Sequence, residues 1–167
     1  MSKQMTEKRL MNIALFYLSR YDASEAKLRT MLSRRILKMK MRGEEIPEEV
    51  TTWVENVIRK IRDYAYIDDK RYAENKIRTM VEQGKSERYM SLKLKEAGIN
   101  SQAIHRILEE MGSSEVDRAL CYAYKKKLGQ FRSKSQRIDY RQKDMAALAR
   151  AGFSYEVSLA VLEGKAE

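Results

Sequence analysis

The sequence predicts an all-α protein of about nine helices, arranged as three tandem three-helix repeats in an elongated, curved array. Three observations support this fold class. Seven glycines and one proline in 167 residues are too few for a turn-rich β protein. Apolar residues recur at helical spacing, and no stretch alternates as a strand would. The glycines stand between the apolar runs, where glycine commonly closes a helix.

The first third of the chain contains three such runs. In the first, Leu10, Ala14 and Leu18 share one helix face. Before the second, Asp22 and Glu25 have the spacing of a capping box, and Pro47 stands where the third should begin. The stripes of the second and third runs are Leu28, Leu32, Ile36 and Met39, then Val50, Val54, Val57, Ile58 and Ile61.

The rest of the chain continues in the same way. Gly84, Gly98, Gly112, Gly129 and Gly152 separate six further predicted helices. Their apolar residues are Tyr72, Ala73, Ile77, Met80 and Val81; Met90, Leu94 and Ala97; Ile104, Ile107, Leu108 and Met111; Val116, Ala119, Leu120, Ala123 and Leu128; Ile138, Met145, Leu148 and Ala151; and Val157, Val161 and Leu162.

An internal repeat is visible in the sequence. "LKLKEAGINSQAIHRIL" at 92–108 aligns with "AALARAGFSYEVSLAVL" at 146–162, so that Asn100 and Ser154 occupy the same N-cap slot. The first third matches more weakly through "EIPEEVTTWVENVI". We therefore predict repeats at 1–62 with a basic N-terminal part, at 63–112, and at 113–167 with a basic loop. Units this small must pack in series.

The net charge indicates a polyanionic partner. The chain carries 34 basic and 24 acidic residues, a net charge of +10, which favours nucleic acid, an anionic membrane or an acidic protein. No apolar run approaches the ~20 residues of a membrane span. The charged N-terminus lacks the apolar core of a secretory signal. We expect a cytoplasmic monomer without a membrane partner.

The positive charge is concentrated in the two end regions. Residues 1–43 hold eleven basic and three acidic residues, and 114–167 hold eleven and seven. We predict salt-sensitive phosphate contacts at both ends, against the alternative of a solvated surface. Tyr17, Tyr21, Tyr122, Tyr124 and Phe131 are candidates for base stacking, although core packing suits most of them better. The N-terminal basic set is Arg34, Arg35, Lys38, Lys40 and Arg42, and the C-terminal basic set is Lys125, Lys126, Lys127, Arg132, Lys134, Arg137, Arg141 and Lys143.

Paired carboxylates occur in "AYIDDKRYAENKI" at 65–77. Asp68 or Asp69 precedes a predicted helix, where an aspartate caps free backbone N–H groups, and Tyr66 with Ile67 has the position of a hydrophobic staple. A metal or acid–base site is the alternative, but no histidine or further carboxylate cluster lies nearby in sequence. We therefore favour capping.

No catalytic constellation is found in the sequence. His105 is the only histidine and Cys121 the only cysteine, and both suit packing or surface positions. A phosphate-binding loop, a metal-ligand spacing and a nucleophile elbow are all missing from the pattern. We predict no enzyme activity, no metal and no cofactor; an enzyme whose site assembles only in three dimensions is the alternative.

Several segments now resemble one family. "AYIDDKRYAENKIR", "GKSERYMSLKLKEAGI" and "RQKDMAALARAGFSYEVSLAVL" resemble, in order, three signature segments of the RecX family, and "ALFYLSRYDASEAKLRTML" resembles its first repeat. The likeness covers nearly the whole chain. Ala65 stands for the usual glycine before the aromatic, Ser86 for a second glycine, and Ala151 for a common arginine.

The resemblance implies a fold of tandem three-helix repeats and a regulatory role in recombinational DNA repair and the SOS response. Members bind the RecA recombinase and its filaments on DNA. They also contact DNA to varying degrees, so we expect weak, salt-sensitive binding to single-stranded or double-stranded DNA. They restrain strand exchange and ATP hydrolysis without catalysing a reaction, and are proposed to lie in the filament groove. For the motif residues Tyr66, Asp68, Asp69, Arg71 and Tyr72, it implies a role in repeat geometry.

Two other functions remain open from the sequence. Three-helix units with basic helices also suit a general DNA-binding or transcription-regulatory protein built from helix-turn-helix-like units. An adaptor that binds an acidic protein without nucleic acid is the third reading.

Overall fold

The computed structural model describes residues 5–164 and confirms the all-α class. The described residues form nine α-helices and three short 3₁₀ segments, without a strand. They divide into two compact units. Unit 1 runs as far as Tyr72 and includes Glu96–Gly98, and unit 2 comprises Ala73–Lys95 and the chain from Ile99 onward. The three predicted repeats and the elongated, curved shape stay predictions.

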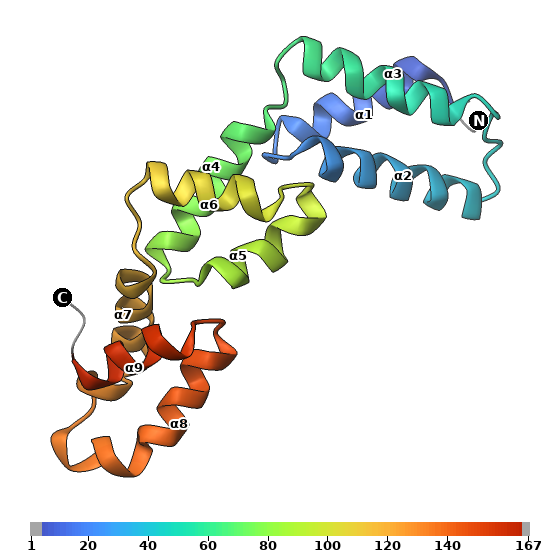
Figure 1. The fold of residues 1–167 in the computed structure, drawn as a ribbon. Coiled ribbons are helices and arrows are strands. Elements are labelled where there is room, and N and C mark those ends of the chain that lie inside the picture. The colour runs from blue at the N-terminus through green and yellow to red at the C-terminus, as the bar shows by residue number, and fades with distance from the viewer. Residues whose placement is uncertain (1–4, 165–167) are drawn as a thin grey trace. The chain divides into compact units, whose positions relative to one another are not determined.

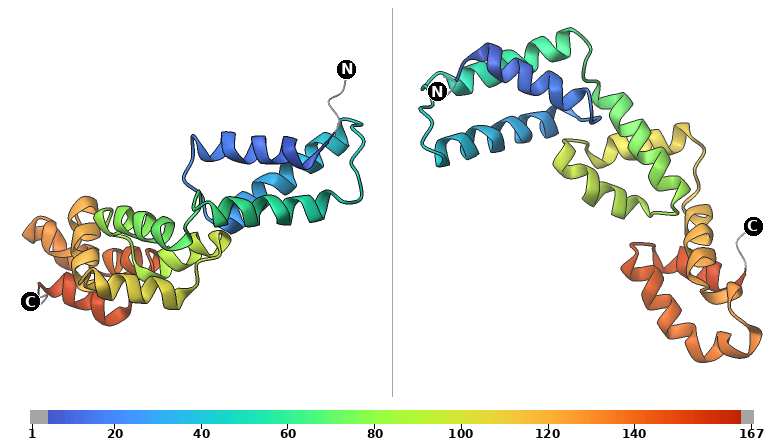
Figure 2. Two further views of the ribbon diagram at one scale, coloured as in Figure 1. Left: turned by 90° about the horizontal axis from the view of Figure 1, so that it is seen from above. Right: turned by 180° about the vertical axis from the view of Figure 1, so that it is seen from behind.

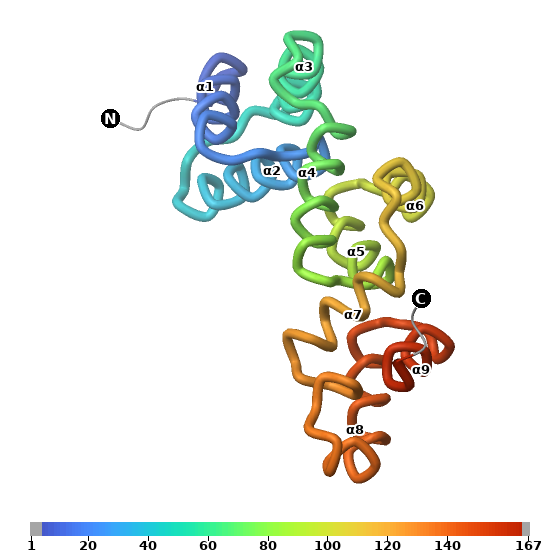
Figure 3. The backbone as a smooth tube through the Cα atoms, turned by 90° about the vertical axis from the view of Figure 1, so that its left-hand side faces the viewer, coloured from blue at the N-terminus to red at the C-terminus, as the bar shows by residue number. Residues whose placement is uncertain are grey.

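Unit 1 is built on three helices that pack pairwise around one core. They are α1 (Glu7–Leu18), α2 (Glu25–Met41) and α3 (Val50–Asp63), and Figures 1 and 3 show them around a common centre. Their predicted stripes face inward as expected of amphipathic helices. The buried core consists of Met5, Leu10, Ala14, Leu28, Leu32, Met39, Val54, Val57, Ile58, Ile61 and Ile67.

The start of α2 differs from the prediction. Its N-cap is Ser24, whose Oγ accepts from the backbone N–H of Lys27 at 3.3 Å. Asp22 lies outside the helix and is exposed, so the capping box that its spacing suggested is wrong. α3 also begins later than expected, at Val50, with Pro47 in the preceding turn.

Unit 2 contains most of the fourth helix and the five that follow. α4 (Asp69–Glu82) crosses the division between the units at Tyr72. In the third predicted repeat, α9 packs against both α7 and α8, as Figure 2 shows from two further sides. The other helices are α5 (Glu87–Leu94), α6 (Ser101–Glu110), α7 (Glu115–Lys126), α8 (Arg137–Arg150) and α9 (Tyr155–Glu163), with 3₁₀ segments at Lys95–Ala97, Gly129–Phe131 and Lys134–Gln136.

Helix ends in unit 2 follow the sequence closely. Asn100 accepts from Ala103 N–H at 2.8 Å and Ser154 from Val157 N–H at 3.2 Å, which confirms both predicted caps. Ile138 does not join the apolar face assigned to it. It is 85% exposed, while Leu148 on the same helix is buried with α7 and α9 residues.

The glycine boundaries rest on backbone conformation. All seven glycines have a positive φ, in the left-handed region; six of them follow a helix or 3₁₀ segment, and Gly129 begins a 3₁₀ segment. Ala65, which stands where the RecX signature has glycine, adopts the same region with φ 55°. It follows α3, and the N–H of Tyr66 reaches back to the carbonyl of Ile61 at 3.0 Å. Ala65 therefore takes a glycine conformation at a steric cost.

Candidate polyanion-binding surface

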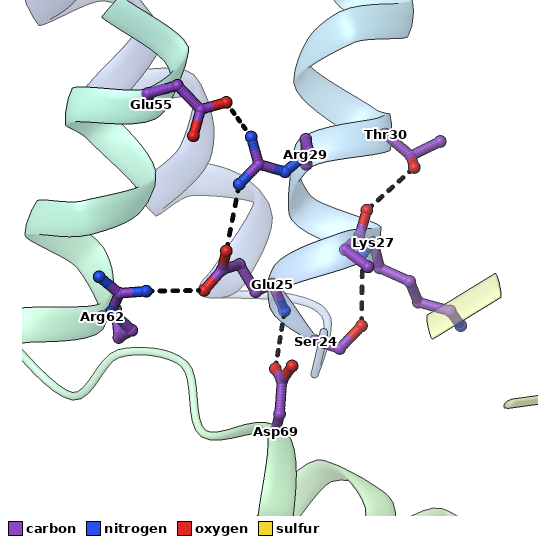
Figure 4. A network of polar contacts seen from close by, with 9 residues as sticks. Ser24, Glu25, Lys27, Arg29, Thr30, Glu55, Arg62 and Asp69 are labelled. Atoms are coloured by element: carbon purple, nitrogen blue, oxygen red, sulfur yellow. Dashed lines mark hydrogen bonds and ion pairs between the residues drawn. The ribbon is translucent and has the colours of Figure 1, made fainter. Parts of the chain in front are cut away.

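The two adjacent aspartates cap two different helices. The Asp68 carboxylate accepts from the N–H of Arg71 at 3.0 Å and so caps α4 itself. Asp69 is the first residue of α4, yet its carboxylate accepts from the N–H of Glu25, at the start of α2, at 2.8 Å. Figure 4 shows Asp69 pointing at that helix end. A carboxylate there also meets the positive end of the helix dipole.

The rest of the motif supports this arrangement. Tyr72 is buried, and the ammonium of Lys27 lies 5.5 Å from its ring centroid. Ile67 enters the unit 1 core, but Tyr66 is 56% exposed and packs edge-on to Tyr64. Arg71 is exposed and contributes its backbone N–H. The predicted staple is therefore limited to Ile67.

A chain of ion pairs neutralises one side of unit 1. Glu25 bonds Arg29 at 3.1 Å and Arg62 at 3.3 Å, and Arg29 also pairs with Glu55, as Figure 4 shows. On another pair of helices, Lys60 donates to Glu7 at 2.6 Å. The hydrogen bond from Lys60, followed by one from Asn56, holds the pKa of Glu7 below its ordinary value. These cations are matched by carboxylates.

The N-terminal basic set has no such partners among the described residues. Its side chains are exposed on α2 and its C-cap, and none makes an ion pair or side-chain hydrogen bond within residues 5–164. Three of its cations line a surface groove of about 880 Å³, which we call the first groove. One carboxylate, from Glu96, also lines it. The first groove consists of Tyr17, Lys27, Thr30, Met31, Arg34, Arg35, Lys38 and Glu96.

A second groove adjoins the first. It has a volume of about 550 Å³ and shares Tyr17, Met31 and Arg35 with its neighbour. Aromatic and arginine side chains dominate it, without a carboxylate. The sequence analysis did not single out Phe16 or Arg20, although their i,i+4 spacing in "FYLSRY" would place them on one face of a continuous helix. In the structure α1 ends at Leu18, and Arg20 lies in the turn that follows. The second groove consists of Arg9, Asn12, Ile13, Phe16, Tyr17, Arg20, Tyr21, Met31 and Arg35.

Several side chains of the C-terminal basic set form intramolecular hydrogen bonds and ion pairs. Arg132 binds Asp144 through two hydrogen bonds of 2.7 and 2.8 Å, and Asp144 also accepts from the N–H of Gly129 at 2.9 Å. Burial raises the pKa of Asp144, but the hydrogen bonds from Arg132 and Gly129 outweigh it and the net pKa is lowered. The same hydrogen bond raises the pKa of Arg132. The pair fixes the basic loop against α8.

Four more members of this set have intramolecular partners. Arg137 donates to the carbonyls of Gln130 at 2.7 Å and Arg132 at 3.2 Å. Arg141 pairs with Glu163 at 3.1 Å, and Lys125 donates to a backbone carbonyl of α4 at 2.9 Å. Lys143 lies 5.0 Å from the ring centroid of Tyr140. The exposed cations without a partner among the described residues are Lys126, Lys127 and Lys134.

The aromatic candidates separate by exposure. Tyr21 is 58% exposed and Tyr124 is 69% exposed. Tyr122 and Phe131 pack against the core shared by α7, α8 and α9, and Tyr17 packs against that of unit 1. Tyr124 also meets the ring of Phe131 edge-on at 5.5 Å. Among the described residues, only the grooves of unit 1 are lined both by exposed aromatic rings and by cations without a carboxylate partner.

Other candidate groups do not assemble a reactive site. His105 lies between Glu87 and Glu109, with N–O distances of 3.4 and 3.3 Å. Cys121 is half-buried, and its thiol faces the carbonyl of Glu82. Arg118 is buried, and desolvation lowers its pKa; its guanidinium donates to Ser113. Within residues 5–164 no three His, Cys, Asp or Glu side chains are grouped to hold a metal.

A helix must be both long and apolar to cross a membrane. Across the part of the chain that the structure describes, none combines the length and the apolar character needed to cross a bilayer.

Comparison with known proteins gives a consistent family. The chain is 35% identical over 158 residues to the regulatory protein RecX of Myxococcus xanthus, covering 92% of this chain and 84% of that protein. It is 28% identical over 152 residues to the regulatory protein RecX of Agrobacterium fabrum, covering 90% and 80%. No protein-family model matches the chain.

Solved structures agree on the fold. The crystal structure of RecX from Lactobacillus salivarius superposes with a TM-score of 0.67 at 23% identity, covering 95% of both chains. A second RecX crystal structure gives a TM-score of 0.64 at 24% identity, covering 94% of this chain and 71% of the other. With the helix order and the sequence identity to the M. xanthus protein, these findings show that the chain belongs to the RecX family of regulatory proteins.

Proposed function

We propose that this protein is a non-enzymatic negative regulator of the RecA recombinase. It binds RecA and its DNA filaments and restrains strand exchange and ATP hydrolysis in recombinational DNA repair. The supporting observation is a RecX family chain that carries, on α2 and its C-cap, five exposed cations without carboxylate partners among the described residues. Such a surface suits a partner on which phosphates and acidic side chains occur together.

The mechanism we propose is filament binding that blocks growth or favours disassembly. The N-terminal basic set supplies the main electrostatic contact, because intramolecular pairs hold Lys125, Arg132, Arg137 and Arg141 of the other set. Lys126, Lys127 and Lys134 add a second contact. Asp68 and Asp69 act only through the fold, by fixing α4 and α2.

The test is ATP hydrolysis by the cognate RecA on single-stranded DNA while this protein is titrated in. We expect inhibition, and substoichiometric inhibition would indicate action on filament ends or growth. Inhibition only near saturation would indicate coating of the filament. An unchanged hydrolysis rate, together with a strong preference for one duplex sequence, would overturn the proposal in favour of a general DNA-binding protein.

A further inference from the structure

The two adjoining grooves of unit 1 contain exposed aromatic rings, which a contact with phosphate alone does not require. Phe16 is 62% exposed and Tyr21 is 58% exposed, although both sit on a domain that buries many apolar side chains. Their place in the second groove puts them next to the cations of the first. A surface made only to neutralise phosphate has no use for exposed aromatic rings.

The rings and the cations form one continuous surface. The guanidinium of Arg20 lies 4.4 Å from the ring centroid of Phe16, and the rings of Tyr17 and Tyr21 are 5.1 Å apart. Arg35 and Tyr17 line both grooves. Apart from Glu96 in the first groove, no carboxylate lines either of them. Positive charge therefore runs alongside exposed π-faces.

We propose that this surface, formed by the end of α1 and the outer face of α2, binds unpaired nucleotides of a single nucleic-acid strand. Bases stack on Phe16 and Tyr21, and the backbone phosphates meet Arg34, Arg35 and Lys38. The inference rests on the proposed function, for which it names the nucleic-acid contact.

Three features favour a single strand over other polyanions. Stacked bases inside a duplex do not present free faces to a side chain, whereas unpaired bases do. The groove volumes of about 880 and 550 Å³ lie in the range of roughly 300–1,000 Å³ that holds a ligand of nucleotide size. An acidic peptide would use the cations but has no need for the flat rings of Phe16 and Tyr21.

The experiment measures binding of the full chain to three fluorescein-labelled probes by anisotropy. The probes are an oligothymidylate, an abasic oligonucleotide with the same number of phosphates, and a duplex of the same length. We expect the oligothymidylate to bind tightest. Phe16→Leu keeps an apolar side chain but removes the ring, and it should weaken oligothymidylate binding at least about fivefold. It should leave abasic binding unchanged.

Matched variants separate stacking from charge and from folding. Tyr21→Ala should weaken oligothymidylate binding, and Tyr21→Phe, which keeps the ring, should restore it. Tyr155→Ala removes an equally exposed ring, 67% accessible, from unit 2 and should have no effect. Arg34→Gln with Arg35→Gln should weaken binding of all three probes. Unchanged far-UV circular dichroism shows that each variant is folded.

Several outcomes would overturn the inference. Equal affinity for the normal and abasic strands would remove the need for stacking, as would wild-type binding by both Phe16→Leu and Tyr21→Ala. A preference for the duplex would exclude an unpaired strand. Displacement of the probe by polyglutamate, with loss of polyglutamate binding in Phe16→Leu, would assign the surface to an acidic protein partner.

Inhibition of RecA ATP hydrolysis, measured on the same preparations, keeps the two proposals apart. Wild-type inhibition that is accompanied by ring-independent strand binding would refute the inference and leave the proposed function standing. Ring-dependent strand binding without inhibition would support the inference and refute the regulatory proposal.

Discussion

At the scale of single residues, the Asp68–Asp69 pair shows how one short motif ties two helices together. Asp68 acts within four residues of chain, whereas Asp69 acts on a helix that begins 44 residues earlier. The N–H of Glu25, the first residue of α2, donates to Asp69, whereas the hydroxyl of Ser24 accepts from the N–H of Lys27, the third residue. The α2 terminus therefore has two caps, one local and one tertiary.

This arrangement predicts unequal costs for three aspartate substitutions. Asp69→Ala leaves the partly buried N–H of Glu25 without its partner and should lower the free energy of unfolding by about 1–2 kcal/mol. Asp68→Ala removes the α4 cap and should cost about 1 kcal/mol. Asp22→Ala should stay within about 0.5 kcal/mol, since Asp22 caps nothing. Urea unfolding followed by the fluorescence of Trp53, which packs on the unit 1 core, measures all three.

Asp69→Asn serves as the internal control, because the side-chain amide oxygen keeps an acceptor for Glu25 N–H. It should cost less than Asp69→Ala. A cost for Asp22→Ala as large as that for Asp69→Ala would show that the tertiary cap is energetically unimportant.

At the scale of helices, the end of α3 carries a strained residue. Ala65 has a left-handed φ of 55°, which costs an alanine about 1–2 kcal/mol. Ala65→Gly removes that cost but adds backbone entropy to the unfolded chain, about 0.5–1 kcal/mol. We expect a net gain in stability of about 0.5–1 kcal/mol, measured by urea unfolding with circular dichroism.

The same substitution in a helix interior should have the opposite sign. Ala146 is exposed in the middle of α8, so Ala146→Gly should lose about 1 kcal/mol. Destabilisation by both glycine substitutions would mean that the Ala65 turn is not strained.

Most helices and their ends were predictable from the sequence, because residues close together in the chain determine them. The nine helices, the glycine boundaries and the caps at Asn100 and Ser154 depend on residues within one turn of each other. Asp22 and Ser24 are both good caps two residues apart, and spacing alone chose the wrong one. The role of Asp69 was not predictable, since its partner is remote in sequence.

The candidate surface was predicted only in part, because its contacts also join residues that are remote in sequence. The charge counts identified both basic sets, but they do not show which cations form ion pairs. Arg132 therefore appeared equivalent to Arg34, although Arg132 is paired with Asp144. The second groove was predicted only in part: Tyr17 and Tyr21 were candidates for base stacking, but helical spacing gave no indication that Phe16 remains exposed.

At the scale of the whole molecule, the distribution of charge matters more than its total of +10. Unit 1 contains two kinds of cation. Arg29, Lys60 and Arg62 each have a carboxylate within hydrogen-bonding range. Arg34, Arg35 and Lys38 have none among the described residues. Only cations that are free to replace counterions around phosphate contribute to the salt dependence of nucleic-acid binding.

Two triple variants with the same net charge test this distinction. Replacing Arg34, Arg35 and Lys38 by Gln, or Arg29, Lys60 and Arg62 by Gln, lowers the net charge from +10 to +7 in each case. The first triple should reduce the slope of log affinity against log salt for a single-stranded oligonucleotide by about 2, at about 0.7 per phosphate contact. The second triple should leave the slope near wild type. It should lower stability instead, because Glu7, Glu25 and Glu55 lose their ion-pair partners. Anisotropy titrations across a salt series give both slopes. Equal reductions in the two variants would show that net charge, and not the unpaired face of α2, controls binding.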